Sequence, residues 1–150
     1  MDKVTYPEGQ VVNFINERVV PVRIPYDQKP LAEQFQVKWT PLFIILDAEG
    51  NEHYRTNGFL APYELISMIL LGTGKLHFDR EAFTRAIGAF DELLEKYPDS
   101  GAAPEAVYFR GVSGYKRDEK PEPLKEAFEI LRNKYPENPW AKRAAPYHLL

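Results

Sequence analysis

Few residues in this sequence have side chains that could carry out covalent chemistry, and none of them is a thiol. The 150 residues include no cysteine, which excludes disulfides, thiolate metal sites and thiol catalysis within this chain. The three histidines, His53, His77 and His148, lie in different predicted elements, and their spacing does not suggest a metal site. No serine lies in a Gly-x-Ser-x-Gly element, and residues 72–75, Gly-Thr-Gly-Lys, lack the Walker spacing of a phosphate-binding loop. We therefore predict no catalytic residue, no metal and no cofactor for this chain.

The charge and hydropathy of the chain leave proteins or peptides as its expected partners. Its 19 basic and 22 acidic residues are spread along the sequence and give a net charge of −3, which provides no footprint for nucleic acid. The longest apolar run, over residues 65–71, is far shorter than the roughly 20 residues that cross a bilayer. The first residues lack the apolar segment of a signal peptide, so a cytoplasmic location is expected if Met1 is the true start.

The most informative segment is a threonine-proline pair that precedes a wholly apolar strand. Thr40 and Pro41 are followed by Leu-Phe-Ile-Ile-Leu at 42–46, and Asp-Ala-Glu-Gly-Asn at 47–51 supplies turn residues before a return strand. This pattern predicts a β-hairpin. Trp39 directly precedes the pair. If exposed, it offers a flat apolar contact to a partner; the alternative is a tryptophan partly buried at the sheet edge.

Other elements are expected on both sides of this hairpin. The spacing of apolar residues predicts a helix over 11–18, a short buried strand over 19–24 and a helix that starts at 27–30. Pro21 weakens the strand prediction, because proline cannot donate a hydrogen bond to a neighbouring strand. Pro62 opens a further helix, and His53 is expected on the exposed face of the return strand.

From residue 78 onward the periodicity is wholly helical, and we divide the chain into two domains, 1–72 and 78–150, joined by a linker at 73–77. Asp79 is the expected N-cap of a helix that ends before Pro98, and further helices are expected to begin near Pro104 and Pro123. Residues 89–98 and 127–136 share six identities in ten positions at an offset of 38. This internal repeat resembles tetratricopeptide-like repeats, whose units are two antiparallel helices.

Two tyrosines of the repeat region are candidates for peptide binding. Tyr108 and Tyr115 are seven residues apart on one helix face, where they could line a concave groove; the alternative is a packing role in the core. Repeat arrays need about three units to bury a continuous core. Fewer than two complete units fit here, so the helices are expected to pack on the first half or on another chain.

Residues 1–71 resemble the later part of a thioredoxin-like domain, on the strength of the Thr40-Pro41 strand and of Met-Asp-Lys-Val-Thr-Tyr-Pro at 1–7. The resemblance implies that Pro41 follows a cis peptide bond and faces two redox cysteines, while the backbone of Thr40 pairs with an extended substrate. It also places a Cys-x-x-Cys motif immediately upstream of Met1. Truncation of a longer parent is the favoured explanation, and a product that has lost redox chemistry is the other.

The expected fold is therefore α/β: a partial thioredoxin-like sheet with flanking helices, followed by antiparallel helical hairpins of the tetratricopeptide-like kind. The expected function is that of a redox-inactive remainder of a thiol-disulfide oxidoreductase. The alternative is a non-catalytic protein- or peptide-binding module that uses the helical repeats. In the thioredoxin fold a strand lies between those that match 19–24 and 42–46. Its absence predicts a homo-oligomer formed by strand or helix exchange.

Overall fold

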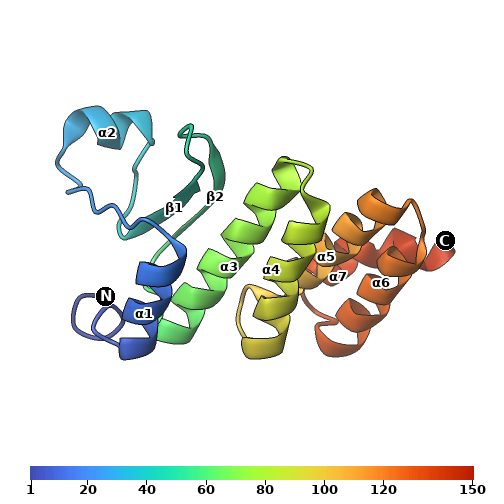
Figure 1. Cartoon of the computed structure of the whole chain (residues 1–150). Helices are drawn as coiled ribbons and strands as arrows, with labels where there is room; N and C mark the ends of the chain where they lie inside the picture. The colour runs from blue at the N-terminus through green and yellow to red at the C-terminus, as the bar shows by residue number, and fades with distance from the viewer.

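The computed structural model describes residues 1–150 and shows a mixed α/β chain that is mostly helical, with one two-stranded antiparallel sheet. Figure 1 shows α3 to α6 side by side, with α1 and the hairpin at one end of this array and the C-terminus at the other. None of the helices is long and apolar enough to cross a membrane. The elements in chain order are α1 (Gly9–Arg18), α2 (Lys29–Gln34), β1 (Leu42–Leu46), β2 (Glu52–Asn57), α3 (Pro62–Asp79), α4 (Phe83–Lys96), α5 (Ala103–Asp118), α6 (Glu122–Lys134), α7 (Pro139–Ala144) and a final 3-10 turn (Ala145–Leu149).

The hairpin forms where the sequence predicts it. β1 and β2 pair antiparallel, with Phe43 opposite Thr56 and Ile45 opposite Tyr54. The Asp47 carboxylate accepts the backbone N–H of residue 49 at 3.0 Å and that of residue 51 at 2.8 Å, which fixes the turn. Gly50 has a φ of 85°, a conformation that glycine adopts without steric cost.

The expected buried strand at 19–24 is wrong. This segment follows α1 as extended but unpaired chain, and every residue from 20 to 30 is exposed. A buried strand needs a partner for its N–H and C=O groups, and neither β1 nor β2 pairs with this segment. Its β-branched sequence is therefore not enough to form a strand.

The expected linker at 73–77 is also wrong, because α3 continues without interruption to Asp79. A Cβ at Gly72 would collide with the Ile45 side chain, and a Cβ at Gly74 would collide with the ring of Phe90. These glycines therefore allow close packing inside a helix. Asp79 ends α3 and does not cap the next helix, which begins four residues later after a reversal at residue 81 with a φ of 56°. The division into two domains stays a prediction.

The 38-residue repeat has a structural counterpart. Tyr97 and Tyr135, which end α4 and α6, have the same backbone angles, φ −133° and ψ 48°. The turn after each tyrosine repeats as well, since residues 100 and 138 donate their N–H to the preceding tyrosine carbonyl. The hydroxyl of Tyr135 donates to the carbonyl of Pro98 at 2.7 Å and joins the two units.

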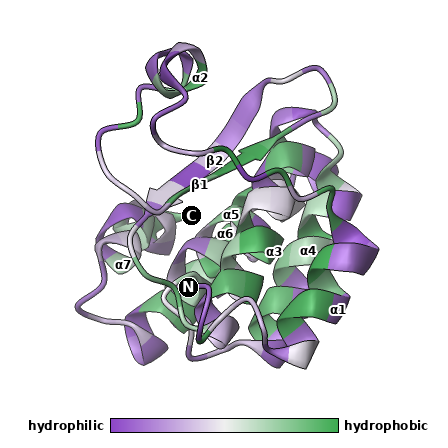
Figure 2. Cartoon of the chain, turned by 90° about the vertical axis from the view of Figure 1, so that its left-hand side faces the viewer, coloured by the Kyte–Doolittle hydropathy of each residue, from purple (hydrophilic) through white to green (hydrophobic).

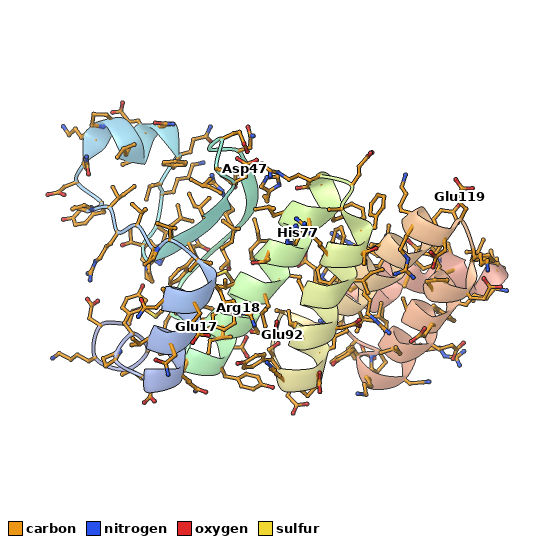
Figure 3. The ribbon with its side chains drawn as sticks, in the orientation of Figure 1. Glu17, Arg18, Asp47, His77, Glu92 and Glu119 are labelled. Atoms are coloured by element: carbon orange, nitrogen blue, oxygen red, sulfur yellow. The ribbon has the colours of Figure 1, made fainter.

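The helix α3 belongs to both halves of the chain. Its buried residues from Leu65 to Leu71 share one core cluster with Phe90 and Leu93 of α4, and Phe43 and Ile45 of the hairpin pack against the same cluster. At the surface, the Arg18 guanidinium of α1 donates to the Glu92 carboxylate of α4 at 3.1 and 3.2 Å. Figure 3 shows both side chains between α1 and α4. The first half therefore packs directly on the helical half.

Candidate functional site

A cis peptide bond joins Thr40 and Pro41, as the resemblance predicts. The carbonyl of Pro41 accepts the N–H of Gly58 at 2.9 Å, so the proline is fixed at the open end of the hairpin. Pro41 is half-buried and Thr40 is exposed. The structure thus holds the proline in place while it leaves the residue before it accessible.

A cavity of about 220 Å³ lies beside this peptide bond, lined by Tyr26, Val37, Lys38, Trp39 and Thr40. Both aromatic side chains reach into solvent, because Trp39 is 69% exposed and Tyr26 is 76% exposed. Trp39 is therefore exposed and is not partly buried at the sheet edge. The cavity is below the range of about 300–1,000 Å³ that is typical of small-molecule sites. Its size suits one side chain of a protein segment, and its lining combines the apolar surface of Tyr26, Val37 and Trp39 with the polar groups of Lys38 and Thr40.

The strand that follows Pro41 has one edge without a partner. Antiparallel pairing uses alternate residues, and the bond from Gly58 to Pro41 fixes which residues of β1 turn towards β2. The backbone groups of Phe43 and Ile45 face β2, while those of Leu42, Ile44 and Leu46 face away. No strand pairs with these three residues, and no other hydrogen bond reaches their backbone. They form what we call the free edge of β1.

The side chains around the free edge are apolar. Phe43 and Ile45 pack against the core, so alternation places Leu42, Ile44 and Leu46 on the opposite face of the hairpin. Figure 2 shows β1 as hydrophobic beside the hydrophilic β2, with α2 apart from the rest of the chain. The five residues of β1 include no charged residue and no proline, two of the devices that usually protect an edge strand from pairing; the bulge of the hairpin is in β2.

The segment from 19 to 28 adds further exposed apolar surface. The exposed fractions of Val20, Val22 and Ile24 are 89%, 77% and 40%. The ion pair that Arg23 forms with Asp2, at 2.9 Å, is itself on the surface, with side chains 79% and 62% exposed. Surface pairs of this kind add little stability. Little therefore holds this segment against movement.

His53 is not on the exposed face where the sequence places it. It is the extra residue of a bulge, because Tyr54 lies opposite Ile45 while Glu52 lies opposite Leu46. Its side chain is only 9% exposed and lies between two carboxylates: Nδ1 is 2.6 Å from Asp79, and Nε2 is 3.1 Å from Asp47. Figure 3 shows Asp47 between the hairpin and the end of α3. This imidazole joins β2 to the last residue of α3.

The charges around His53 shift its titration. The hydrogen bond to Asp79 raises the pKa of His53; burial opposes this rise and the bond to Asp47 adds to it. Burial opposes ionisation of Asp47 too, but hydrogen bonds from Asn51, His53 and Arg80 hold its pKa well below the usual range. No group of side chains in the structure could hold a metal ion. The contacts of His53 with Asp47 and Asp79 make the cluster a link between the hairpin and the end of α3.

The two tyrosines of the predicted groove have different surroundings. Tyr108 stacks on Tyr147 with ring centroids 5.8 Å apart and accepts its hydroxyl hydrogen at 2.9 Å, and it also contacts Trp140. Tyr115, at the end of α5, is 42% exposed. Neither residue lines the cavity beside Trp39 and Thr40. Tyr108 thus has the packing role that was the alternative to peptide binding. A binding role for either tyrosine stays a prediction.

A second cavity, of about 270 Å³, lies among α4, α5 and α6. Its apolar lining includes Leu94, Val107 and Ile130, and Arg110 at its side pairs with Asp91 at 2.6 Å. Neither Tyr108 nor Tyr115 lines this cavity. The sequence predicted a groove in the helical half but named other residues for it.

The chain was compared with family models, with curated proteins and with solved structures, and none of them matches it. Sequence reasoning located the cis-proline pair and the exposed tryptophan but missed Tyr26, Val37 and Lys38, which complete the cavity. It also missed the His53 cluster. No local signal reports that cluster, because its members come from a turn, a bulge and the end of a helix.

Proposed function

We propose that this chain is a thioredoxin-like protein without redox cysteines whose cis-proline loop and free strand edge bind an extended protein segment. The observation that carries the proposal is the cis Thr40–Pro41 bond at the start of a strand whose outer edge has no partner. An extended segment added there would satisfy the free N–H and C=O groups, and the adjacent cavity would accept one of its side chains.

Thiol chemistry requires a thiolate, and these 150 residues contain none. We further propose that a thiol-disulfide oxidoreductase forms when a Cys-x-x-Cys segment from outside these 150 residues occupies the position beside β1. Pro41 would then lie next to the cysteines, as the resemblance to thioredoxin-like proteins implies. The alternative is a module that binds a protein or peptide without chemistry, which the second cavity among α4, α5 and α6 favours.

The gene sequence upstream of the Met1 codon separates these two functions. We expect an in-frame Cys-x-x-Cys within a few codons, and an in-frame stop codon would exclude the oxidoreductase and leave the binding module. In an insulin-reduction assay, the 150-residue chain should give the background rate. A longer chain that includes the motif should reduce insulin, and Pro41→Ala should slow that longer chain. Turnover by the 150-residue chain would contradict the proposal.

A further inference from the structure

We propose that a second copy of this chain occupies the free edge of β1, so that two β1 strands pair antiparallel about a twofold axis at Ile44. The inference rests on the proposed function, because it names the partner of the same edge in the 150-residue chain, where no Cys-x-x-Cys segment occupies that edge. The combined sheet would have four strands in the order β2, β1, β1 of the partner copy, β2 of the partner copy. Such a contact is isologous, with the same residues on both sides.

The sequence of the edge is self-complementary. The outward-facing residues Leu42, Ile44 and Leu46 read the same in both directions. Antiparallel pairing centred on Ile44 places Leu42 of each copy opposite Leu46 of the other, and Ile44 opposite itself. All three then become hydrogen-bonded pairs, which satisfies the free backbone groups of both strands with about six hydrogen bonds. The three apolar side chains of each copy meet on one face.

The flanking charges favour the antiparallel arrangement. Lys38 precedes β1 and Glu49 follows it; both are exposed, and Glu49 also pairs with Arg80 at the end of α3. Antiparallel pairing brings the start of one strand, with its lysine, near the end of the other, with its glutamate. Parallel pairing would place like charges together at both ends.

Few contacts hold α2 and the segment after α1 in place. No contact joins α2 to β1, and α2 is connected to the hairpin by the bond from Arg55 to the Phe35 carbonyl at 3.1 Å. Residues 20–28 are exposed and include one surface ion pair, whereas Val19 packs against the core around α3. Pairing with a second copy would therefore displace α2 and residues 20–28 and leave Val19 in place.

The absence of native cysteine makes disulfide cross-linking a direct test. In a hydrogen-bonded antiparallel pair, opposite Cα atoms are about 5.5 Å apart, within the range of about 4.4–6.8 Å that a disulfide spans. Ile44→Cys should therefore form a covalent dimer under mild oxidation at low micromolar concentration. Val20→Cys, at a position 89% exposed and outside the strand, controls for random collision and should stay monomeric.

Two further variants test the register. Leu42→Cys alone and Leu46→Cys alone should not cross-link, because identical positions would be about 13 Å apart along the strands. A mixture of the two should cross-link. Cross-linking by Leu42→Cys alone that equals cross-linking by the mixture would contradict the proposed register. If circular dichroism shows that Ile44→Cys does not fold, the Leu42→Cys and Leu46→Cys variants test the pairing without it.

Light scattering of the unmodified chain completes the experiment. We expect a monomer that converts to a dimer as the concentration rises. A stable monomer at every concentration, or a dimer that fails to cross-link through Ile44→Cys, would overturn the proposal. A stable monomer would leave the proposed function intact, with the edge open to a different protein segment, because the upstream gene sequence does not depend on the oligomeric state.

Discussion

At the residue scale, His53 is the side chain that most depends on its neighbours. It bridges a turn residue, Asp47, and the last residue of α3, Asp79, and Arg80 also contacts Asp47 at 3.2 Å. The imidazole is nearly buried, so these carboxylates, and not water, stabilise its protonated form. The bulge in β2 makes this geometry possible, because it places His53 where a regular strand would not.

The raised pKa of His53 gives the pH dependence of this link. A histidine whose pKa is higher in the folded state contributes stability that is complete below about pH 6.5, its unfolded pKa. That contribution is lost as pH rises through the folded pKa. We expect the difference in unfolding free energy between the unmodified chain and His53→Gln to be larger at pH 6 than at pH 8.5, measured by urea denaturation.

His77 provides a control of opposite sign. Burial, with the charges of Arg85 and Arg80, lowers the pKa of His77. Its contribution is therefore present above about pH 6.5 and is lost as pH falls through the lowered pKa. The difference between the unmodified chain and His77→Gln should increase with pH. The same pH trend for both variants would contradict the assignment of the His53 link.

At the element scale, α3 gains its position from glycines that let its neighbours approach. Gly74 lies against the ring of Phe90, which is fully buried. Gly88, in the interior of α4, has nothing within 4 Å of where its Cβ would be. The two positions differ in packing but not in their helical conformation.

A matched pair of substitutions isolates the packing at Gly74. Gly74→Ala and Gly88→Ala share the gain in helix propensity of about 1 kcal/mol. Their difference therefore reports the steric cost at Gly74, which overpacking of a core puts at about 1–3 kcal/mol. We expect Gly88→Ala to be the more stable variant in urea denaturation, with similar slopes for both. Equal midpoints would show that Phe90 can move.

Sequence patterns correctly predicted the elements that depend on neighbouring residues in the chain. The hairpin follows from its apolar strand and turn residues, and the ends of α4 and α6 follow from the repeated Tyr-Pro pairs. The segment 19–24 has a strand sequence, but no partner strand is available to pair with it. The glycines at 72 and 74 suggested a linker, because sequence alone does not show that Ile45 and Phe90 need the space. The missed features all depend on contacts between distant elements.

At the scale of the whole molecule, the chain is a continuous helical array with a small, incompletely covered sheet at one end (Figure 1). The helices supply the core, and the sheet supplies the cis-proline and the free edge. One face of the hairpin packs on α3, the other face is joined to the end of α2 by the bond from Arg55 to the Phe35 carbonyl, and no strand pairs with the outer edge. The account therefore predicts that whatever this chain binds completes its sheet.

Amide hydrogen exchange along β1, measured at a series of protein concentrations, tests this central claim most directly. The N–H groups of Phe43 and Ile45 face β2 and should be protected at every concentration. The N–H groups of Ile44 and Leu46 should exchange rapidly in dilute solution and become protected as the second copy binds. Equal protection of Ile44 and Ile45 in dilute monomer would contradict the account, because the outer edge of β1 would then already have a partner.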